Sequence, residues 1–126
     1  MKIEHVALQV ADPVALTAWY VAHLGLQVLR HFPQRNQTHF LGDDGATVLE
    51  VYHAPGIPVP DYDAQDPLVL HLAFVSTDPD ADARRLIAAG AVLVEEVRPS
   101  DGSLLVMLRD PWGIPIQLCR RTTPLR

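Results

Sequence analysis

The sequence predicts an α+β fold of two repeated β-α-β-β-β units, whose eight strands form an open cup with the helices outside. Residues 5–13 align without a gap with residues 71–79, and both segments end in an Asp-Pro pair. The same order of strand and helix patterns follows each segment. Self-similarity at one fixed period is typical of a fold built from copies of one unit.

The length of 126 residues suits a single domain over 1–126 with its own hydrophobic core. Within it we expect a first unit at residues 1–53, a linker at 54–67 and a second unit at 68–126. The linker holds four prolines, which cannot donate to a sheet ladder.

The first unit begins with residues 3–10, which alternate with a period of two and therefore predict a strand. Val6, Leu8 and Val10 form one face of it, and His5, Ala7 and Gln9 form the other. Asp12 and Pro13 form a helix start, as N-cap and first helical residue. Gly25 is typical of the position just after a helix end. Turn residues then divide the remainder of the unit. The predicted strands lie at about 26–32, 36–42 and 46–53, with a hairpin turn at 43–45.

The second unit repeats this order. Residues 68–76 predict a strand, Asp78 and Pro79 a helix start, and Gly90 the helix end. The segment Asp110–Gly113 fits a type I turn, with Asp first, Pro second and Gly fourth. The predicted strands lie at about 91–98, 102–109 and 114–120.

Composition excludes several classes of protein. The net charge of −5 argues against nucleic acid, whose phosphates need a basic surface. No apolar run approaches the roughly 20 residues of a membrane span, and the N-terminus lacks a secretory signal pattern. Cys119 is the only cysteine, so no intrachain disulfide forms. We expect a cytoplasmic enzyme or binding protein without a membrane partner.

Four side chains that can bind a metal recur at matching places in the two units. His5 precedes Glu50 by 45 positions, and His71 precedes Gln117 by 46. The two histidines are 66 positions apart, and Glu50 and Gln117 are 67 apart. Each unit thus contributes two ligand-type side chains at equivalent positions.

Strand alternation indicates which face these four residues occupy. In the last strand Ile116 and Leu118 alternate with Gln117, so the apolar residues face a helix and Gln117 faces away. The same alternation turns His5 and His71 away from the helices. A single helix covers only one face of each small sheet, so all four side chains are predicted to lie on helix-free faces and to converge in the cup. His39 is a further candidate for this cup.

At this point the chain resembles a known family. The opening segment 5–8 with Asp12, the helix end from Trp19 to Leu26, and the closing segment Asp110–Leu118 are similar to the vicinal oxygen chelate superfamily. This superfamily includes glyoxalase I, methylmalonyl-CoA epimerase, extradiol dioxygenases and the fosfomycin- and bleomycin-resistance proteins. The resemblance covers essentially the whole chain and implies a single glyoxalase-like domain.

The resemblance implies that the metal ligands are His5, Glu50, His71 and Gln117. Two imidazole nitrogens, a carboxylate and an amide oxygen suit a divalent ion such as Ni, Co, Zn, Mn or Fe. The fourth position usually holds Glu in the family. Gln117 offers only a neutral carbonyl oxygen, so we expect it to hold the ion less firmly.

The implied function is that of a metal-dependent lyase or isomerase of the glyoxalase type. It would act on a small α-oxygenated carbonyl compound by proton transfer through a metal-bound enediolate, with Glu50 as both ligand and catalytic base. One alternative is a metal-free small-molecule or drug-binding protein of the bleomycin-resistance type. A ring-cleaving dioxygenase is less favoured, because those enzymes place a carboxylate at the position of Gln117.

Two further positions bear on substrate and assembly. Bacterial glyoxalase I holds glutathione with an arginine and an asparagine at the positions of Gln9 and Ala54, so we expect weak turnover of the glutathione adduct of methylglyoxal. Arg30, Arg98 and Arg109 are possible substitutes for the missing arginine. Short edge strands favour pairing between chains, so we expect a homodimer.

Overall fold

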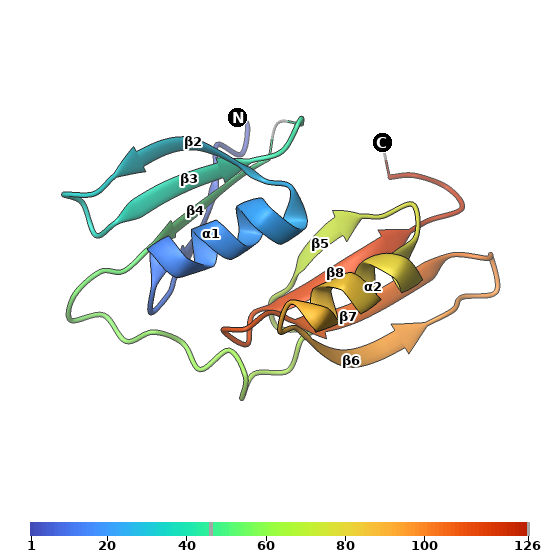
Figure 1. The fold of residues 1–126 in the computed structure, drawn as a ribbon. Coiled ribbons are helices and arrows are strands. Elements are labelled where there is room, and N and C mark those ends of the chain that lie inside the picture. The colour runs from blue at the N-terminus through green and yellow to red at the C-terminus, as the bar shows by residue number, and fades with distance from the viewer. Residues whose placement is uncertain (46, 126) are drawn as a thin grey trace. The chain divides into compact units, whose positions relative to one another are not determined.

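The computed structural model describes residues 1–45 and 47–125, and the chain divides into two compact units, Met1–Pro60 and Asp61–Arg126. Each unit carries four strands and one helix in the order β-α-β-β-β (Figure 1). The predicted fold of two repeated α+β units with eight strands and two helices is therefore confirmed. Neither helix in the described part of the chain has the length and hydrophobicity needed to cross a membrane.

The first unit forms an open four-stranded mixed sheet in the order β1-β4-β3-β2. Its outer strand β1 runs parallel to β4, and the other neighbours are antiparallel. Helix α1 packs on β2, β3 and β4. The elements are β1 (Val6–Gln9), α1 (Pro13–Leu24), β2 (Gln27–Phe32), β3 (Thr38–Gly42) and β4 (Val48–Tyr52).

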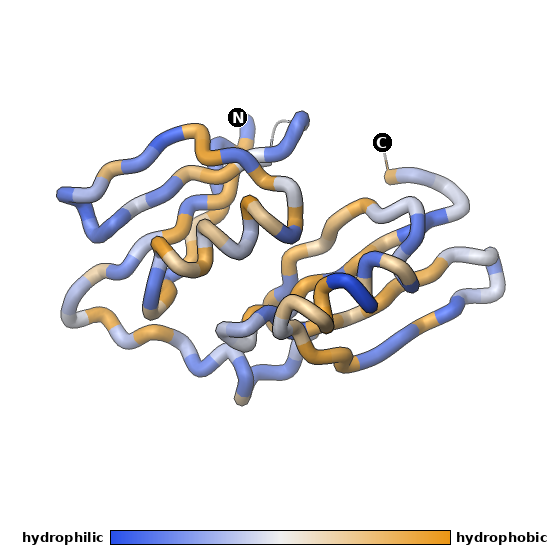
Figure 2. Tube along the Cα trace, viewed as in Figure 1, coloured by the Kyte–Doolittle hydropathy of each residue, from blue (hydrophilic) through white to orange (hydrophobic). Residues whose placement is uncertain are grey.

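The second unit repeats this topology in the order β5-β8-β7-β6, with β5 parallel to β8. Helix α2 packs on β6, β7 and β8. Strands β7 and β8 are largely hydrophobic along their length, whereas α2 contains a strongly hydrophilic stretch (Figure 2). The elements are β5 (Leu72–Val75), α2 (Pro79–Ala88), β6 (Val92–Val97), β7 (Leu104–Arg109) and β8 (Pro115–Arg120).

The two helices begin with the same local interaction. The Asp12 carboxylate accepts a hydrogen bond from the Ala15 N–H, and the Asp78 carboxylate accepts one from the Ala81 N–H. Both satisfy a backbone donor that has no partner within its helix. The helix starts predicted from the Asp-Pro pairs are therefore confirmed.

Each helix buries one face of its own sheet. Most residues that face the helices from β1, β3, β4, β7 and β8 are apolar and buried, whereas the edge strands β2 and β6 stay largely exposed. In the first unit these include Leu8, Val10, Leu41, Leu49 and Val51, with Leu16 and Tyr20 from α1. In the second they include Leu104, Val106, Leu108, Ile114, Ile116 and Leu118, with Leu86 from α2.

The strand predicted at 68–76 is shorter than expected, because β5 starts only at Leu72. The Asp66 carboxylate accepts a hydrogen bond from the Leu68 N–H, and the Asp66 carbonyl accepts one from the Val69 N–H. These bonds close a turn that uses backbone groups a strand would need. The first residue of the strand predicted at 46–53 lies outside the described residues, and β4 begins at Val48.

The segment over residues 54–67 contains no helix or strand in the structure, as its prolines predict. Polar side chains of the two sheets hold it at its ends. The Gln9 amide bonds to the Ala54 N–H and to the carbonyls of Ala54 and Ile57. The Arg109 guanidinium donates to the carbonyls of Tyr62 and Gln65. The segment is therefore bound to both units, each end within its own unit.

The predicted type I turn at Asp110–Gly113 is confirmed by a hydrogen bond from the Gly113 N–H to the Asp110 carbonyl, 3.0 Å long. Gly113 has φ +83°, a backbone angle that residues with a side chain rarely adopt. A Cβ there would lie 2.6 Å from the Asp63 side chain and 2.9 Å from its backbone nitrogen. The turn and the segment ahead of β5 approach each other at a point where only glycine fits.

We predict that Gly113→Ala lowers the free energy of unfolding by about 2–4 kcal/mol, through backbone strain and overpacking together. Gly102→Ala is the matched control, because Gly102 lies in the same unit with φ +86° and its added Cβ meets only Thr122 Oγ1 at 3.5 Å. The control is expected to lose about 1–2 kcal/mol. Urea unfolding of both variants measures the difference, and equal losses would contradict the close approach at Asp63.

Candidate functional site

Parallel pairing of the first and last strand of each unit places the four predicted ligands. In the first sheet Ala7 of β1 lies opposite Glu50 of β4. In the second sheet Ala73 of β5 lies opposite Gln117 of β8. His5 precedes Ala7 by two positions, and His71 precedes Ala73 by two positions. In both units the histidine therefore lies on the same side as the residue with the ligand oxygen, two positions before it in register.

The first pair is in direct contact. His5 Nε2 lies 3.1 Å from Glu50 Oε2, and His5 Nδ1 is bonded to the Glu4 carboxylate. The Glu50 side chain is 19% exposed, and that of His5 is 35% exposed. The hydrogen bond that His5 donates to the Glu4 carboxylate is the main reason that the pKa of His5 lies above its ordinary value, and the charge of Glu50 adds to it.

A positive charge, on His5 itself or on a shared cation, stabilises this contact. An ionised carboxylate only accepts hydrogen bonds, so a histidine between two carboxylates must donate from both nitrogens or share a cation with one of them. Imidazole nitrogens and carboxylate oxygens bind zinc at about 2.0–2.2 Å, so two such donors on one ion lie roughly 2.9–3.4 Å apart. The 3.1 Å between His5 and Glu50 falls in this range. The pair therefore fits a divalent ion in place of the proton.

The second pair consists of neutral donors. His71 Nδ1 lies 3.0 Å from the Pro67 carbonyl oxygen, which can only accept a hydrogen bond. In the neutral imidazole this leaves the lone pair on Nε2, which is the tautomer that a metal-binding histidine needs. Gln117 Oε1 lies 3.3 Å from Cys119 Sγ, whose pKa is raised by burial, so the thiol keeps its proton and donates it.

The four predicted ligands are thus described as two pairs, each within its own unit. Among residues 1–45 and 47–125, no three His, Cys, Asp or Glu side chains gather closely enough to hold a metal ion. The combination of both pairs in one site stays a prediction.

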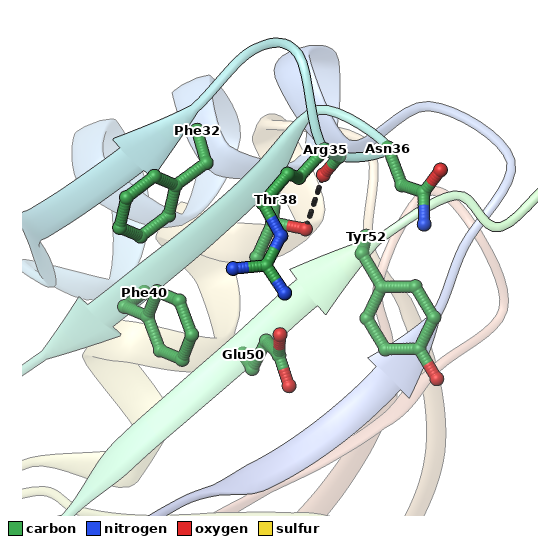
Figure 3. Close-up of a pocket in the computed structure, with 7 residues that line it drawn as sticks. All are labelled: Phe32, Arg35, Asn36, Thr38, Phe40, Glu50 and Tyr52. Carbon is green, nitrogen blue, oxygen red and sulfur yellow. Dashed lines mark hydrogen bonds between the residues drawn. The ribbon is translucent and has the colours of Figure 1, made fainter.

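A pocket adjoins the first pair. It has a volume of about 200 Å³, and all seven lining residues belong to the first unit. Figure 3 shows the Arg35 guanidinium and the Glu50 carboxylate turned into this space, with aromatic rings around it. The lining residues are Phe32, Arg35, Asn36, Thr38, Phe40, Glu50 and Tyr52.

Sequence reasoning did not identify Arg35 or Tyr52 as pocket residues. Tyr52 follows Glu50 by two positions on β4, so strand alternation was a sufficient signal for it. Arg35 lies in the loop between β2 and β3, where no periodic pattern applies. Its approach to Glu50 depends on the pairing of β3 with β4, which places Phe40 opposite Glu50.

His39, a further candidate in the sequence, does not line this pocket. His39 lies opposite Val51 on β4 and shares the helix-facing side with Leu41, and it is 6% exposed. Thr38 and Phe40 face the pocket instead. Burial is the main reason that the pKa of His39 is lowered. Both sides of this strand carry apolar residues, so alternation alone pointed to neither face.

A second pocket, of about 340 Å³, lies entirely in the second unit. Met107 on its wall is opposite Gln117 in the β7–β8 ladder, and Glu95 is opposite Met107 in the β6–β7 ladder. Pocket and ligand pair therefore share one face of the sheet. The other lining residues are Asp66, Pro67, Leu68 and Val94.

Two of the three arginines considered as substrate-binding residues are engaged in other interactions. Arg98 forms ion pairs with Glu96 and with Asp80. Arg109 donates to three backbone carbonyls, including that of Gly113. Both side chains therefore have structural partners within the second unit.

The model of the Glyoxalase/Bleomycin resistance protein/Dioxygenase superfamily matches residues 2–118. Among the curated proteins, none matches the chain. Among solved structures, SMU.1112c is 29% identical with a TM-score of 0.73, covering 95% of this chain and 98% of that one.

Two more distant structures share the fold alone. Lactoylglutathione lyase from Agrobacterium tumefaciens is 23% identical with a TM-score of 0.67, covering 94% of this chain and 92% of that one. The antibiotic-binding protein TnmS3 from Streptomyces sp. CB03234 is 21% identical with a TM-score of 0.71, covering 97% of each chain. With strand order, repeat and family match in agreement, the chain belongs to the Glyoxalase/Bleomycin resistance protein/Dioxygenase superfamily.

Proposed function

We propose that this protein is a divalent-metal-dependent lyase or isomerase that acts on a small α-oxygenated carbonyl compound by proton transfer. The observation that carries the proposal is the contact between His5 and Glu50. His5 Nε2 and Glu50 Oε2 lie at a distance that suits two ligands of one metal ion, and Glu4 is bonded to the other ring nitrogen of His5. The repeat of a histidine and an oxygen donor in the second unit, at His71 and Gln117, supports a set of four ligands.

The proposed ligands are His5, Glu50, His71 and Gln117, and the ion is Ni, Co, Zn, Mn or Fe. A bound ion would supply Lewis-acid polarisation of a carbonyl oxygen. The chain's own groups orient the ligands. Glu4 and the Pro67 carbonyl each bond to Nδ1 of a histidine, which fixes the ring and directs Nε2 to the site.

Glu50 is the proposed catalytic base. It is the only carboxylate among the four residues, and its side chain lines the pocket of the first unit. Phe40 lies opposite Glu50 and packs edge to face against His5, with ring centroids 5.7 Å apart. This apolar neighbour limits water at the carboxylate, which favours proton transfer to and from a bound compound.

The alternative function is metal-free binding of a small molecule. The pocket beside Glu50 supports it, and so does the likeness in fold to an antibiotic-binding protein. Ring-cleaving dioxygenase chemistry is the least favoured, because Gln117 is neutral where those enzymes carry a carboxylate. Metal binding separates the first two possibilities.

We predict that protein purified without chelator contains about one divalent ion per set of four ligands. After chelation, adding Ni, Co, Zn or Mn is expected to raise the melting temperature by several degrees, because binding at 100 times Kd adds about 2.7 kcal/mol. Metal analysis and thermal unfolding measure both effects. His71→Ala should abolish both effects, and His23→Ala, in the last turn of α1, should not. A wild type without metal and without stabilisation would favour the binding protein.

We predict that Gln117→Glu raises the affinity for the divalent ion by about tenfold or more, because a charged carboxylate replaces a neutral amide oxygen. Gln27→Glu on the exposed strand β2 adds the same charge in the first unit and serves as the control. Competition with a fluorescent chelator measures both affinities. Equal affinities for the two variants would place Gln117 outside the metal site.

We predict weak turnover of the methylglyoxal–glutathione hemithioacetal, with kcat/KM below ~10⁴ M⁻¹s⁻¹. Gln9, at the position of the glutathione-binding arginine, is 8% exposed and bonded to Ala54 and Ile57. It therefore offers no cation to the glutathione carboxylates, and each lost charge-assisted bond costs about 1.5–3 kcal/mol. A hemithioacetal assay on metal-loaded protein tests this, and a value above that limit would contradict it.

We also propose a homodimer. The edge strand β5 presents Val75 with 94% exposure, and all six residues of the edge strand β6 are exposed. Exposed edges pair readily with strands of another chain. Light scattering at micromolar concentration is expected to give twice the 13.9 kDa of one chain. A strict monomer would exclude the dimer.

A further inference from the structure

Hydrogen bonds hold the backbone of Arg35 in place, whereas its guanidinium has no partner among residues 1–45 and 47–125. The Arg35 N–H donates to the Phe32 carbonyl at 3.0 Å, and the Arg35 carbonyl accepts from the N–H and the hydroxyl of Thr38. The His53 N–H donates to the neighbouring Asn36 carbonyl at 2.9 Å. These bonds tie the β2–β3 loop to the end of β4, where Tyr52 lines the pocket.

The loop adopts an unfavourable conformation to hold this geometry. Asn36 and Gln37 have φ of 57° and 52°, which is uncommon for residues other than glycine. With the hydrogen bond from Thr38 to Arg35, they form a turn of type I′. Strain of this kind persists only where surrounding contacts enforce it and is frequent at binding sites.

The charge of Arg35 is available, unlike that of three arginines in the second unit. Arg85 and Arg98 form ion pairs, and Arg109 binds backbone carbonyls. The Arg35 guanidinium makes no hydrogen bond or ion pair with any described residue. Among the described arginines, only Arg35 lines one of the two pockets.

We propose that the pocket of the first unit binds a small carboxylic acid, whose carboxylate pairs with Arg35 and whose body lies against Phe32, Phe40 and Tyr52. The inference rests on the proposed function and narrows its substrate to an α-oxygenated compound that also carries a carboxylate. A planar guanidinium matches a carboxylate through two parallel hydrogen bonds. Aromatic rings favour an apolar or aromatic body.

The charge balance of the pocket favours a monoanion over a phosphate. Arg35 is the only cation and Glu50 the only anion among the seven lining residues. A phosphate dianion would add a second negative charge beside Glu50 without a second cation to offset it. The volume of about 200 Å³ is also below the roughly 300–1,000 Å³ of drug-sized sites, which fits a small molecule.

The test is a titration of the protein with mandelate, an aromatic α-hydroxy acid, after a chelator has removed metal ions. Calorimetry and backbone amide NMR measure the binding. Mandelamide is the uncharged comparison, and phenyl phosphate tests the other anion. The chelator removes metal chemistry, so failure of this inference and failure of the proposed function are distinguishable. Variants are Arg35→Gln, Arg35→Lys, Glu50→Gln and the control Arg84→Gln, which removes an exposed charge from α2.

Mandelate is expected to bind more tightly than mandelamide and phenyl phosphate. Arg35→Gln should weaken the affinity for mandelate by about tenfold or more, and Arg35→Lys should weaken it by less. Arg84→Gln should change this affinity by less than about twofold. Glu50→Gln should raise the affinity for mandelate, because it removes a negative charge that repels the mandelate carboxylate. An unchanged amide spectrum shows that each variant keeps its fold.

Four results would overturn the inference. They are equal binding of mandelate and mandelamide, equal effects of Arg35→Gln and Arg84→Gln, tighter binding of phenyl phosphate, and no gain in Glu50→Gln. Absence of mandelate binding by both the wild type and Glu50→Gln would overturn it as well. If Arg35→Gln alters the amide spectrum beyond the loop, Arg35→Lys against Arg84→Gln gives the same comparison with the charge kept.

Discussion

Parallel pairing of the first and last strands of each unit is the constraint on which the site depends. A parallel pair needs a crossover connection, and α1 and α2 begin these connections and cover one sheet face. The opposite face receives the polar residues, so His5 meets Glu50, and His71 lies two positions before Ala73, the register partner of Gln117. A slip of one residue in β4 would turn Glu50 into the helix-packed core.

The two copies of the unit have diverged in charge at equivalent places. The first unit carries Glu50 next to Phe40 and within reach of Arg35, so its face is polarised by both signs. The second carries Gln117 next to Met107, with a buried thiol as the hydrogen-bond donor. The pocket of the first unit therefore carries one charge of each sign, whereas the pocket of the second unit carries only the carboxylates of Asp66 and Glu95.

Polar side chains in this protein serve structure as often as chemistry. Gln9 stands where bacterial glyoxalase I has a glutathione-binding arginine, and Arg109 is a substrate-binding candidate in the sequence. Both satisfy carbonyl groups of a proline-rich segment that has no ladder of its own. Buried backbone groups need partners, and a segment without secondary structure must obtain them from side chains. The same demand explains why these side chains are unavailable to a ligand.

The amino-acid sequence by itself determined the order of elements, the helix starts and the helix-free face of Glu50 and Gln117, because alternation and capping act between near neighbours. It also indicated the turn at Asp110. Tertiary structure decided the features that join distant segments. The Asp66 turn shortened β5, the pairing of β3 with β4 turned His39 to the helix side, and the β2–β3 loop brought Arg35 over Glu50. A side chain's partner depends on which backbone hydrogen bonds bring its strand beside another, and local pattern carries no record of that choice.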